Sequence, residues 1–181
     1  IPLKLADRRA INTLILSAWD DIAEKDKEHR ISKRELRGPA DTGSNPTRLD
    51  GTLSRLQSCQ LKMKIQRDGK SYTKSVSLLR SYAIPDDGTG DILYEFEPVA
   101  MFQTSTHWGR LERSVILHFR SRYSLSLYEL LMKRIRLRWK WKETFDVAEL
   151  RSLLGVPDGK LKAYKTFKQK VLKPAFIEVN G

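Results

Sequence analysis

At Cys59 the spacing of apolar residues changes, and this change limits the folds that the chain can adopt. Before it, Leu49, Leu53 and Leu56 recur at intervals of four and three, which places them on one face of a helix. After it, apolar and polar residues alternate over residues 61–66, the pattern of a half-buried strand. A helix that leads directly into such a strand predicts a mixed α+β domain.

A β-hairpin is predicted from this strand onward. Asp68-Gly69 is the two-residue signal of a tight hairpin turn. Residues 71–83, rich in Tyr, Val, Ser and Leu, are expected to form the returning strand. Turn-forming residues at 85–90 then precede a third predicted strand at 92–96.

Two helices are predicted near the start of the chain. Residues 7–25 carry apolar side chains at helical spacing, with charged residues between them, and predict an amphipathic helix. Residues 25–30 are entirely polar and predict a loop. Ser32 and Glu35 have the spacing of a capping box, in which each side chain satisfies a free amide of the other residue. A short second helix is therefore expected at residues 33–37.

A third helix is predicted at residues 46–59, because Asn45-Pro46 supplies an N-cap followed by a proline at the first helical position. Three helices followed by a hairpin are the order of a winged helix, in which the last two helices form a helix-turn-helix and the hairpin is the wing. The outward face of the third helix supplies four candidate DNA contacts: Thr47, Arg48, Ser54 and Arg55.

The middle of the chain gives a weaker pattern. Residues 108–119 fit either a strand or a helix, and a strand is favoured. An apolar stripe then predicts a long helix at residues 124–139, whose end is rich in Lys and Arg. Cations at a helix C-terminus suit the helix dipole, but this basic run exceeds what capping needs.

A second helix-turn-helix is predicted near the end of the sequence. Asp146 and Glu149 have the spacing of another helix start, and Gly155 marks the end of that helix. A further apolar stripe predicts a helix over residues 160–171. Pro174 lacks an amide hydrogen, so the helix is expected to kink there or to restart with Pro174 as its first residue.

Basic residues are concentrated in the second half of the chain. Residues 1–100 contain 17 Lys and Arg against 15 Asp and Glu, whereas residues 101–181 contain 17 against 7. The second half therefore carries a net charge of +10. Nucleic acid and anionic lipid both attract such a surface, so a polyanionic partner is expected. For any one basic segment, a solvated helix face is the alternative.

The sequence carries no motif of catalysis, metal binding or membrane insertion. No apolar run approaches the roughly 20 residues that a membrane span needs, and the first residues lack the apolar stretch of a signal peptide, so a cytoplasmic protein is expected. The single cysteine, Cys59, excludes an internal disulfide and has no zinc-ligand neighbours. His29, His107 and His118 form no His-x-His pair, and an ATP phosphate loop and a serine-hydrolase elbow are both lacking. We therefore expect a protein that is not an enzyme and has no catalytic residue, metal or cofactor.

Two blocks of the second half resemble a known family. The run SRYSLSLYELL at residues 121–131 is similar to a signature segment of the replication initiators of iteron-bearing bacterial plasmids. Residues 145–157 and 167–175 resemble the second winged helix of the same family. Residues 1–120 match the family mainly in architecture.

The resemblance implies two winged-helix domains in tandem that bind double-stranded DNA from the same side. It places the first at residues 1–142, including the connecting helix 124–139, and the second at residues 143–181. The second is expected to lack its wing, because the sequence stops where that hairpin should begin, as in a truncated chain or a variant with an incomplete wing. Initiators of this kind bind iterons as monomers and often form dimers that repress their own gene. The host replication initiator and helicase are further expected partners.

The recognition helix of the family corresponds to residues 160–171 of this chain. The resemblance therefore makes five lysines the first candidates for DNA contact, mostly to phosphate: Lys160, Lys162, Lys165, Lys168 and Lys170. Arg122, in the signature segment, is a further candidate. Tyr123 and Tyr128 are expected to be core residues that hold the two domains together.

Two other functions fit the same sequence. A winged-helix transcriptional repressor without a role in replication would bind a single palindrome instead of tandem repeats. An interaction module of another class would bind protein through its winged helices and an acidic partner or RNA through its basic stripe. Binding to duplex DNA that weakens steeply with salt would separate this module from a DNA-binding protein.

Overall fold

The computed structural model describes residues 3–22, 24, 26–37, 46–97, 111–135 and 142–181. The chain forms two compact units, the first built mainly from residues 6–105 and the second mainly from residues 106–181. Within the described ranges, no helix is both long enough and apolar enough to cross a membrane.

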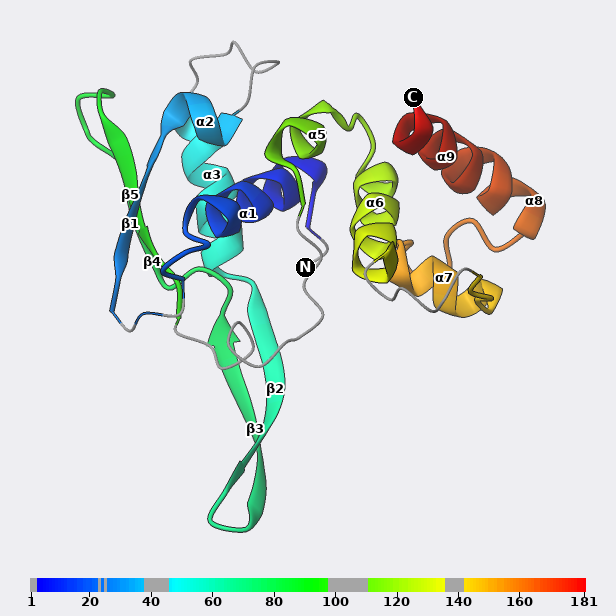
Figure 1. Cartoon of the computed structure of the whole chain (residues 1–181), viewed down its shortest axis with the longest axis horizontal. Helices are drawn as coiled ribbons and strands as arrows, with labels where there is room; N and C mark the ends of the chain where they lie inside the picture. Colours follow the sequence, from blue (N-terminus) through cyan, green and yellow to red (C-terminus); the bar gives the residue numbers. More distant parts are fainter. Residues whose placement is uncertain (1–2, 23, 25, 38–45, 98–110, 136–141) are drawn as a thin grey trace. The chain divides into compact units, whose positions relative to one another are not determined.

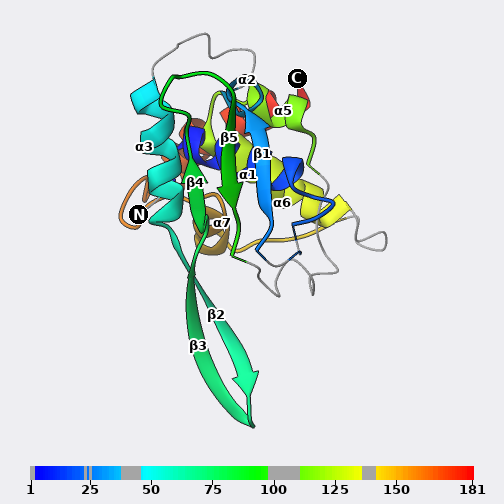
Figure 2. The ribbon, with the colours of Figure 1, turned by 90° about the vertical axis from the view of Figure 1, so that its left-hand side faces the viewer.

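The first unit combines helices with two separate β-structures. Its described elements are α1 (Leu5–Ser17), β1 (Glu28–Ser32), α2 (Lys33–Arg37), α3 (Pro46–Gln57), β2 (Gln60–Arg67), β3 (Lys70–Ser77), β4 (Ser81–Ala83) and β5 (Asp91–Glu95) (Figure 1). An antiparallel sheet has the strand order β1-β5-β4, and β2 pairs with β3 in a two-stranded ribbon. The sheet lies on one side of α1 and α3 (Figure 2). The predicted α+β class is confirmed, as is the order of three helices before a hairpin.

The capping box predicted at the start of α2 is confirmed. The Ser32 hydroxyl accepts a hydrogen bond from the Glu35 amide at 3.1 Å, and the Ser32 amide donates to a carboxylate oxygen of Glu35 at 3.4 Å. These bonds satisfy amides that a helix start otherwise leaves unpaired, so α2 begins at Lys33 as predicted. Asn45, the predicted N-cap of α3, lies outside the described residues.

The first helix is shorter than predicted. It ends at Ser17, although the predicted helix continues to residue 25. Ala18 and Ile22 are nevertheless buried, as their spacing predicts. Asp20 and Asp21 follow the helix end, and negative charges in a last helical turn are unfavourable for the helix dipole.

The predicted loop at residues 25–30 is wrong in its second half, because β1 begins at Glu28. His29 faces Tyr94 across the sheet and is only 7% exposed. The His29 Nδ1 lies 3.1 Å from an Asp21 carboxylate oxygen, and its ring centroid is 5.4 Å from that of Tyr94. The sequence pattern did not predict this strand because a histidine occupies the inward position, where an aliphatic residue is usual.

Tyr94 of β5 links the sheet to α1. Its hydroxyl donates to the Leu14 carbonyl at 2.9 Å, and its side chain is 1% exposed. Burial raises the pKa of this hydroxyl to about 12, because the charged phenolate loses its hydration. The neutral hydroxyl is therefore the form that the folded core holds.

Replacing Tyr94 with Phe is expected to lower the free energy of unfolding by about 1 kcal/mol at neutral pH, because one buried hydrogen bond is lost. The contribution from the raised pKa is fully present below pH 10 and is lost as pH rises towards 12. Urea unfolding at pH 7 and at pH 11 should therefore show a smaller alkaline loss for the variant than for the unmodified chain. If both proteins lose the same unfolding free energy between pH 7 and pH 11, groups other than Tyr94 cause the alkaline sensitivity.

The predicted hairpin is confirmed. Arg67 pairs with Lys70 across the Asp68-Gly69 turn. Both turn residues have positive φ, at 51° and 72°, which the tight turns of β-hairpins require. The ribbon extends away from the helices and the sheet of its unit (Figures 1 and 2). The predicted returning strand at residues 71–83 is divided, because β3 ends at Ser77 and the following segment enters the core at the fully buried Leu79.

The second unit is helical in its described part. Its elements are α5 (Arg113–His118), α6 (Arg122–Ile135), α7 (Val147–Leu153), α8 (Tyr164–Phe167), the π-helical turn η1 (Lys168–Leu172) and α9 (Lys173–Asn180). The strand favoured at residues 108–119 is wrong, because its described part contains α5. Ile116 and Leu117 are both buried, whereas a strand sends adjacent side chains to opposite faces.

The connecting helix α6 begins two residues before its predicted start and is described as far as Ile135. The rest of the predicted helix, and with it Arg136, Arg138 and Lys140, lies outside the described residues. α6 belongs to the second compact unit, although the domain boundary expected from the sequence places it in the first.

The core of the second unit joins α6 to the predicted helix-turn-helix. Its buried members are Leu127, Leu154, Val156, Phe167, Val171 and Ala175. α7 begins where predicted, since the Asp146 carboxylate accepts from the Ala148 amide at 2.7 Å. The helix-turn-helix pattern therefore fixes both the start of α7 and the buried side of the helix that follows.

The second helix of this pair starts later than predicted, at Tyr164 and not at residue 160. Gly159 and Leu161 have positive φ values of 75° and 52°, which a right-handed helix excludes. The helix then continues past Pro174 through a widened turn, in which the Lys173 amide donates to the Lys168 carbonyl five residues back. The π-helical turn thus accommodates a proline that has no amide to donate.

Candidate DNA interface

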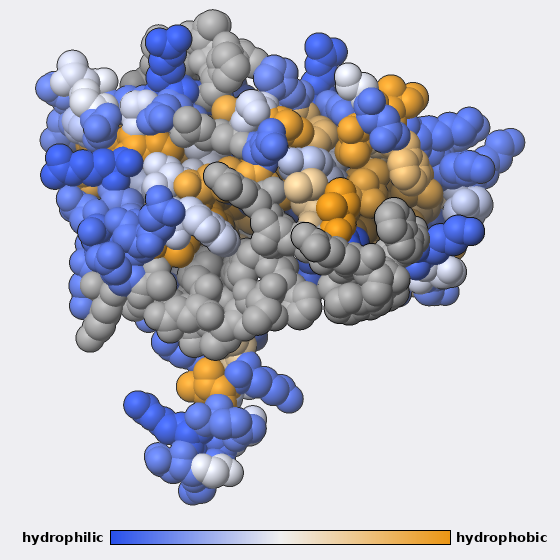
Figure 3. Space-filling view, viewed as in Figure 1, coloured by the Kyte–Doolittle hydropathy of each residue, from blue (hydrophilic) through white to orange (hydrophobic). Residues whose placement is uncertain are grey.

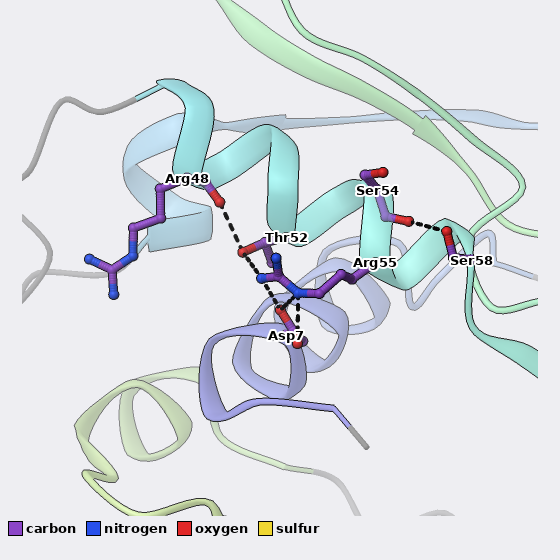
Figure 4. A network of polar contacts seen from close by, with 6 residues as sticks. All are labelled: Asp7, Arg48, Thr52, Ser54, Arg55 and Ser58. Atoms are coloured by element: carbon purple, nitrogen blue, oxygen red, sulfur yellow. Dashed lines mark hydrogen bonds and ion pairs between the residues drawn. The ribbon is translucent and has the colours of Figure 1, made fainter. Parts of the chain in front are cut away.

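α3 presents an exposed face near its start. Thr47 and Arg48 are exposed, and the Arg48 guanidinium points away from the polar network that its backbone joins (Figure 4). Ser54 is also exposed, and Tyr82 of β4 donates from its hydroxyl to the nearby Asp50 carboxylate at 2.8 Å. Burial and the Asp50 carboxylate raise the pKa of this tyrosine. Arg48 is therefore the exposed cation of the predicted face.

Arg55 does not belong to this exposed face. Its Nε and Nη2 donate to the carboxylate of Asp7 in α1, at distances of 2.6 to 3.2 Å (Figure 4). Asp7 is 1% exposed, and the hydrogen bond that its carboxylate accepts raises the pKa of Arg55. Arg55 Nη2 also donates to the Thr52 hydroxyl at 3.1 Å. Arg55 therefore links α1 to α3, and its predicted contact with DNA stays a prediction.

The β2–β3 ribbon carries cations that the sequence prediction did not select. Lys62 and Lys64 are exposed and lie opposite Ser75 and Thr73, so two lysines and two hydroxyls share one face. Two further exposed cations, Arg67 and Lys70, flank the turn. Hydrophilic side chains cover the far end of the ribbon (Figure 3). The alternation of lysine with apolar residues in β2 could have identified this face from the sequence.

The five predicted lysines of the second unit are all exposed, but they do not lie on one regular helix. Lys160 and Lys162 occupy the turn before α8, Lys165 lies in α8, and Lys168 and Lys170 lie in the π-helical turn. None of the ion pairs between described residues uses them. Hydrophilic side chains gather around α8 (Figure 3). The charges of these lysines are therefore available to an external anion.

Two more exposed residues of this helix were not selected from the sequence. Gln169 lies midway between the buried Phe167 and Val171, so it faces away from the core. Lys173, four residues further along, is also exposed. Glutamine can bond two positions of an adenine edge in the major groove, which lysines at phosphates cannot do.

Arg122 is half-buried and contacts its own neighbour. Its Nη2 donates to the Tyr123 hydroxyl at 2.9 Å, and its guanidinium lies 4.8 Å from the centroid of that ring. Tyr123 packs against the core of the second unit. Tyr128 accepts from the Glu112 amide and lies 5.2 Å, between ring centroids, from Phe119. Both tyrosines thus contribute to packing within the second unit.

Comparison with protein families gives two matches. The family described as Initiator Replication protein, WH1, matches residues 1–132, and the family described as Initiator Rep protein, WH2, matches residues 146–181. No curated protein and no solved structure matches the chain. The two families together span most of the sequence and confirm both the resemblance seen in residues 121–175 and the tandem winged-helix fold. The chain therefore belongs to the initiator replication proteins, the DNA-binding winged-helix family that initiates plasmid replication.

Proposed function

We propose that this initiator binds double-stranded DNA at repeated sequences, the iterons, in the origin of a bacterial plasmid. The observation that carries the proposal is the exposed set of cations around α8 and η1, the recognition region of the second unit. Five lysines there are free of ion pairs with described residues and surround an outward-facing glutamine, Gln169. Lysines at phosphates supply affinity, and a side chain at a base edge supplies sequence preference.

The first unit offers a second cationic surface. Its members are Arg48 and Thr47 on α3 and the ribbon cations Lys62, Lys64, Arg67 and Lys70. Because backbone contacts fix the register of a protein on DNA without selecting sequence, we assign positioning to this unit and base recognition mainly to the second. We propose that the two winged-helix domains span residues 1–142 and 143–181.

We base the proposed cellular role of the protein on its family. We propose that the protein acts in the cytoplasm, that monomers bind iterons, and that a dimer represses the protein's own gene. The host replication initiator and helicase are the proposed partners at the opened origin. The proposal involves no enzyme activity, metal or cofactor.

Footprinting on the origin of the cognate plasmid tests the proposal. Protection should recur at the spacing of direct repeats, and binding should weaken steeply as salt rises. Protection of a single palindrome would favour a transcriptional repressor. Tighter binding to single-stranded RNA than to duplex DNA of the same sequence would favour an RNA-binding module and contradict the proposed groove contacts.

A further inference from the structure

Arg151 of α7 is directed at the backbone of the turn that precedes the recognition region. Its Nη2 donates to the Lys162 carbonyl at 2.8 Å. Its Nη1 donates to the carbonyl of Leu161 and lies 3.5 Å from that of Lys160. One guanidinium thus bonds three consecutive carbonyls outside any helix.

The same guanidinium lies 4.6 Å from the centroid of the Phe167 ring, and Phe167 is completely buried in the core of the second unit. Arg151 therefore connects α7, the turn and the first residues of the recognition helix. Only a planar group with several N–H donors can stack on a ring and bond several carbonyls at once, and a lysine ammonium cannot replace it.

The turn is also held by a hydrogen bond from the Lys160 amide to the Pro157 carbonyl at 3.1 Å and by the packing of the half-buried Leu161 against the core. Leu161 is a non-glycine residue at a φ of 52°, which is sterically unfavourable for a branched side chain. Ala163 precedes α8 without a side-chain cap. The lysines on either side of Leu161 are exposed, so the position of their charges depends on the conformation of this backbone.

We propose that Arg151 is a positioning residue for DNA binding. It fixes the turn so that Lys160 and Lys162 meet phosphates together with Lys165 on the first helical turn. Arg151 itself is half-buried and uses its donors internally. Its contribution is therefore made through the lysines and not through its own charge. This inference rests on the proposed binding of duplex DNA.

The test compares Arg151→Lys with Arg151→Gln, using a mixed-sequence 30-base-pair duplex as the probe and titrations at several salt concentrations. Both variants should bind about tenfold more weakly, and the slope of log K against log salt should fall by up to about two, at nearly one for each phosphate contact. The fraction of folded protein is measured by circular dichroism, and affinities are expressed for the folded fraction. Arg151→Lys keeps the charge, so an unchanged affinity and slope for this variant would overturn the proposal.

A double-variant cycle separates positioning from simple stabilisation. In the unmodified chain, Lys160→Ala with Lys162→Ala should weaken binding, but the same pair should add little in the Arg151→Lys background. Full additivity would mean that Arg151 does not act through these lysines and would overturn the inference. If the unmodified chain fails to bind the duplex at all, the proposed function itself fails. If it binds and the lysine pair matters but Arg151→Lys does not, only this inference fails.

Discussion

Replacing Arg55 with Ala is expected to lower the free energy of unfolding of the first unit by about 2–3 kcal/mol, because the buried Asp7 carboxylate would lose the charge-assisted hydrogen bonds that it accepts from the guanidinium. Asp7 is 1% exposed and receives hydrogen bonds from two guanidinium nitrogens. Urea unfolding, followed by amide hydrogen exchange in α1 and α3, measures the effect. A change below 1 kcal/mol would show that the pair contributes little.

Two further variants test whether the loss of stability comes from the Arg55–Asp7 pair. Asp7→Ala should cost less than Arg55→Ala, because the Arg55 side chain is 35% exposed and its charge can reach water. The double variant should be more stable than the sum of the single losses predicts. Arg48→Ala on the same helix is the matched control. Arg48 is exposed, and its loss should alter stability by less than about 0.5 kcal/mol.

Replacing Lys162 and Lys165 with Ala is expected to weaken binding to duplex DNA and to lower the slope of log K against log salt by one to two, since each phosphate contact contributes nearly one. Both side chains are exposed, one in the turn before α8 and one within it. Fluorescence anisotropy with labelled duplex at several salt concentrations measures both quantities. Stability should change little, because neither lysine packs in the core.

The control for this experiment removes a lysine charge elsewhere. Lys27 lies 3.4 Å from an Asp21 oxygen and 3.3 Å from a Glu24 oxygen in the first unit, and these carboxylates raise its pKa. Lys27→Ala should leave the salt slope unchanged. If the Lys162 and Lys165 variant shows the same slope as this control, these two lysines do not contact DNA.

The sequence pattern selects site residues by helix face and charge, and it does not show which groups they contact in the folded protein. Arg48 and Arg55 lie on the same helix and differ little as residues of a sequence. Only the tertiary structure shows that Arg55 meets Asp7 on α1, a residue 48 positions away. Similarly, the five lysines of the second unit were found by their charge, but the sequence pattern placed Lys160 and Lys162 on a helix that begins only at Tyr164.

Local interactions explain which elements the sequence determined. The capping box at Ser32, the Asp68-Gly69 turn and the Asp146 cap each depend on residues two or three positions apart, and all three form as predicted. The buried side of the helix that begins at Tyr164 follows from residues four apart on one helix face. Each of these interactions involves residues within one short segment. They can therefore be predicted without knowing the rest of the fold.

Long-range contacts explain what only the tertiary structure decided. β1 is a strand because β5, whose paired residues lie 59 to 67 positions later, supplies its hydrogen-bond partners, and His29 fills an inward position beside Tyr94. α5 is a helix because neighbouring apolar residues must be buried on the same side. Arg55 and Arg151 obtain their partners only when separate segments meet. A charged side chain bonds to whichever group lies near it in the folded protein. The separation of two residues in the sequence does not give their distance in the fold.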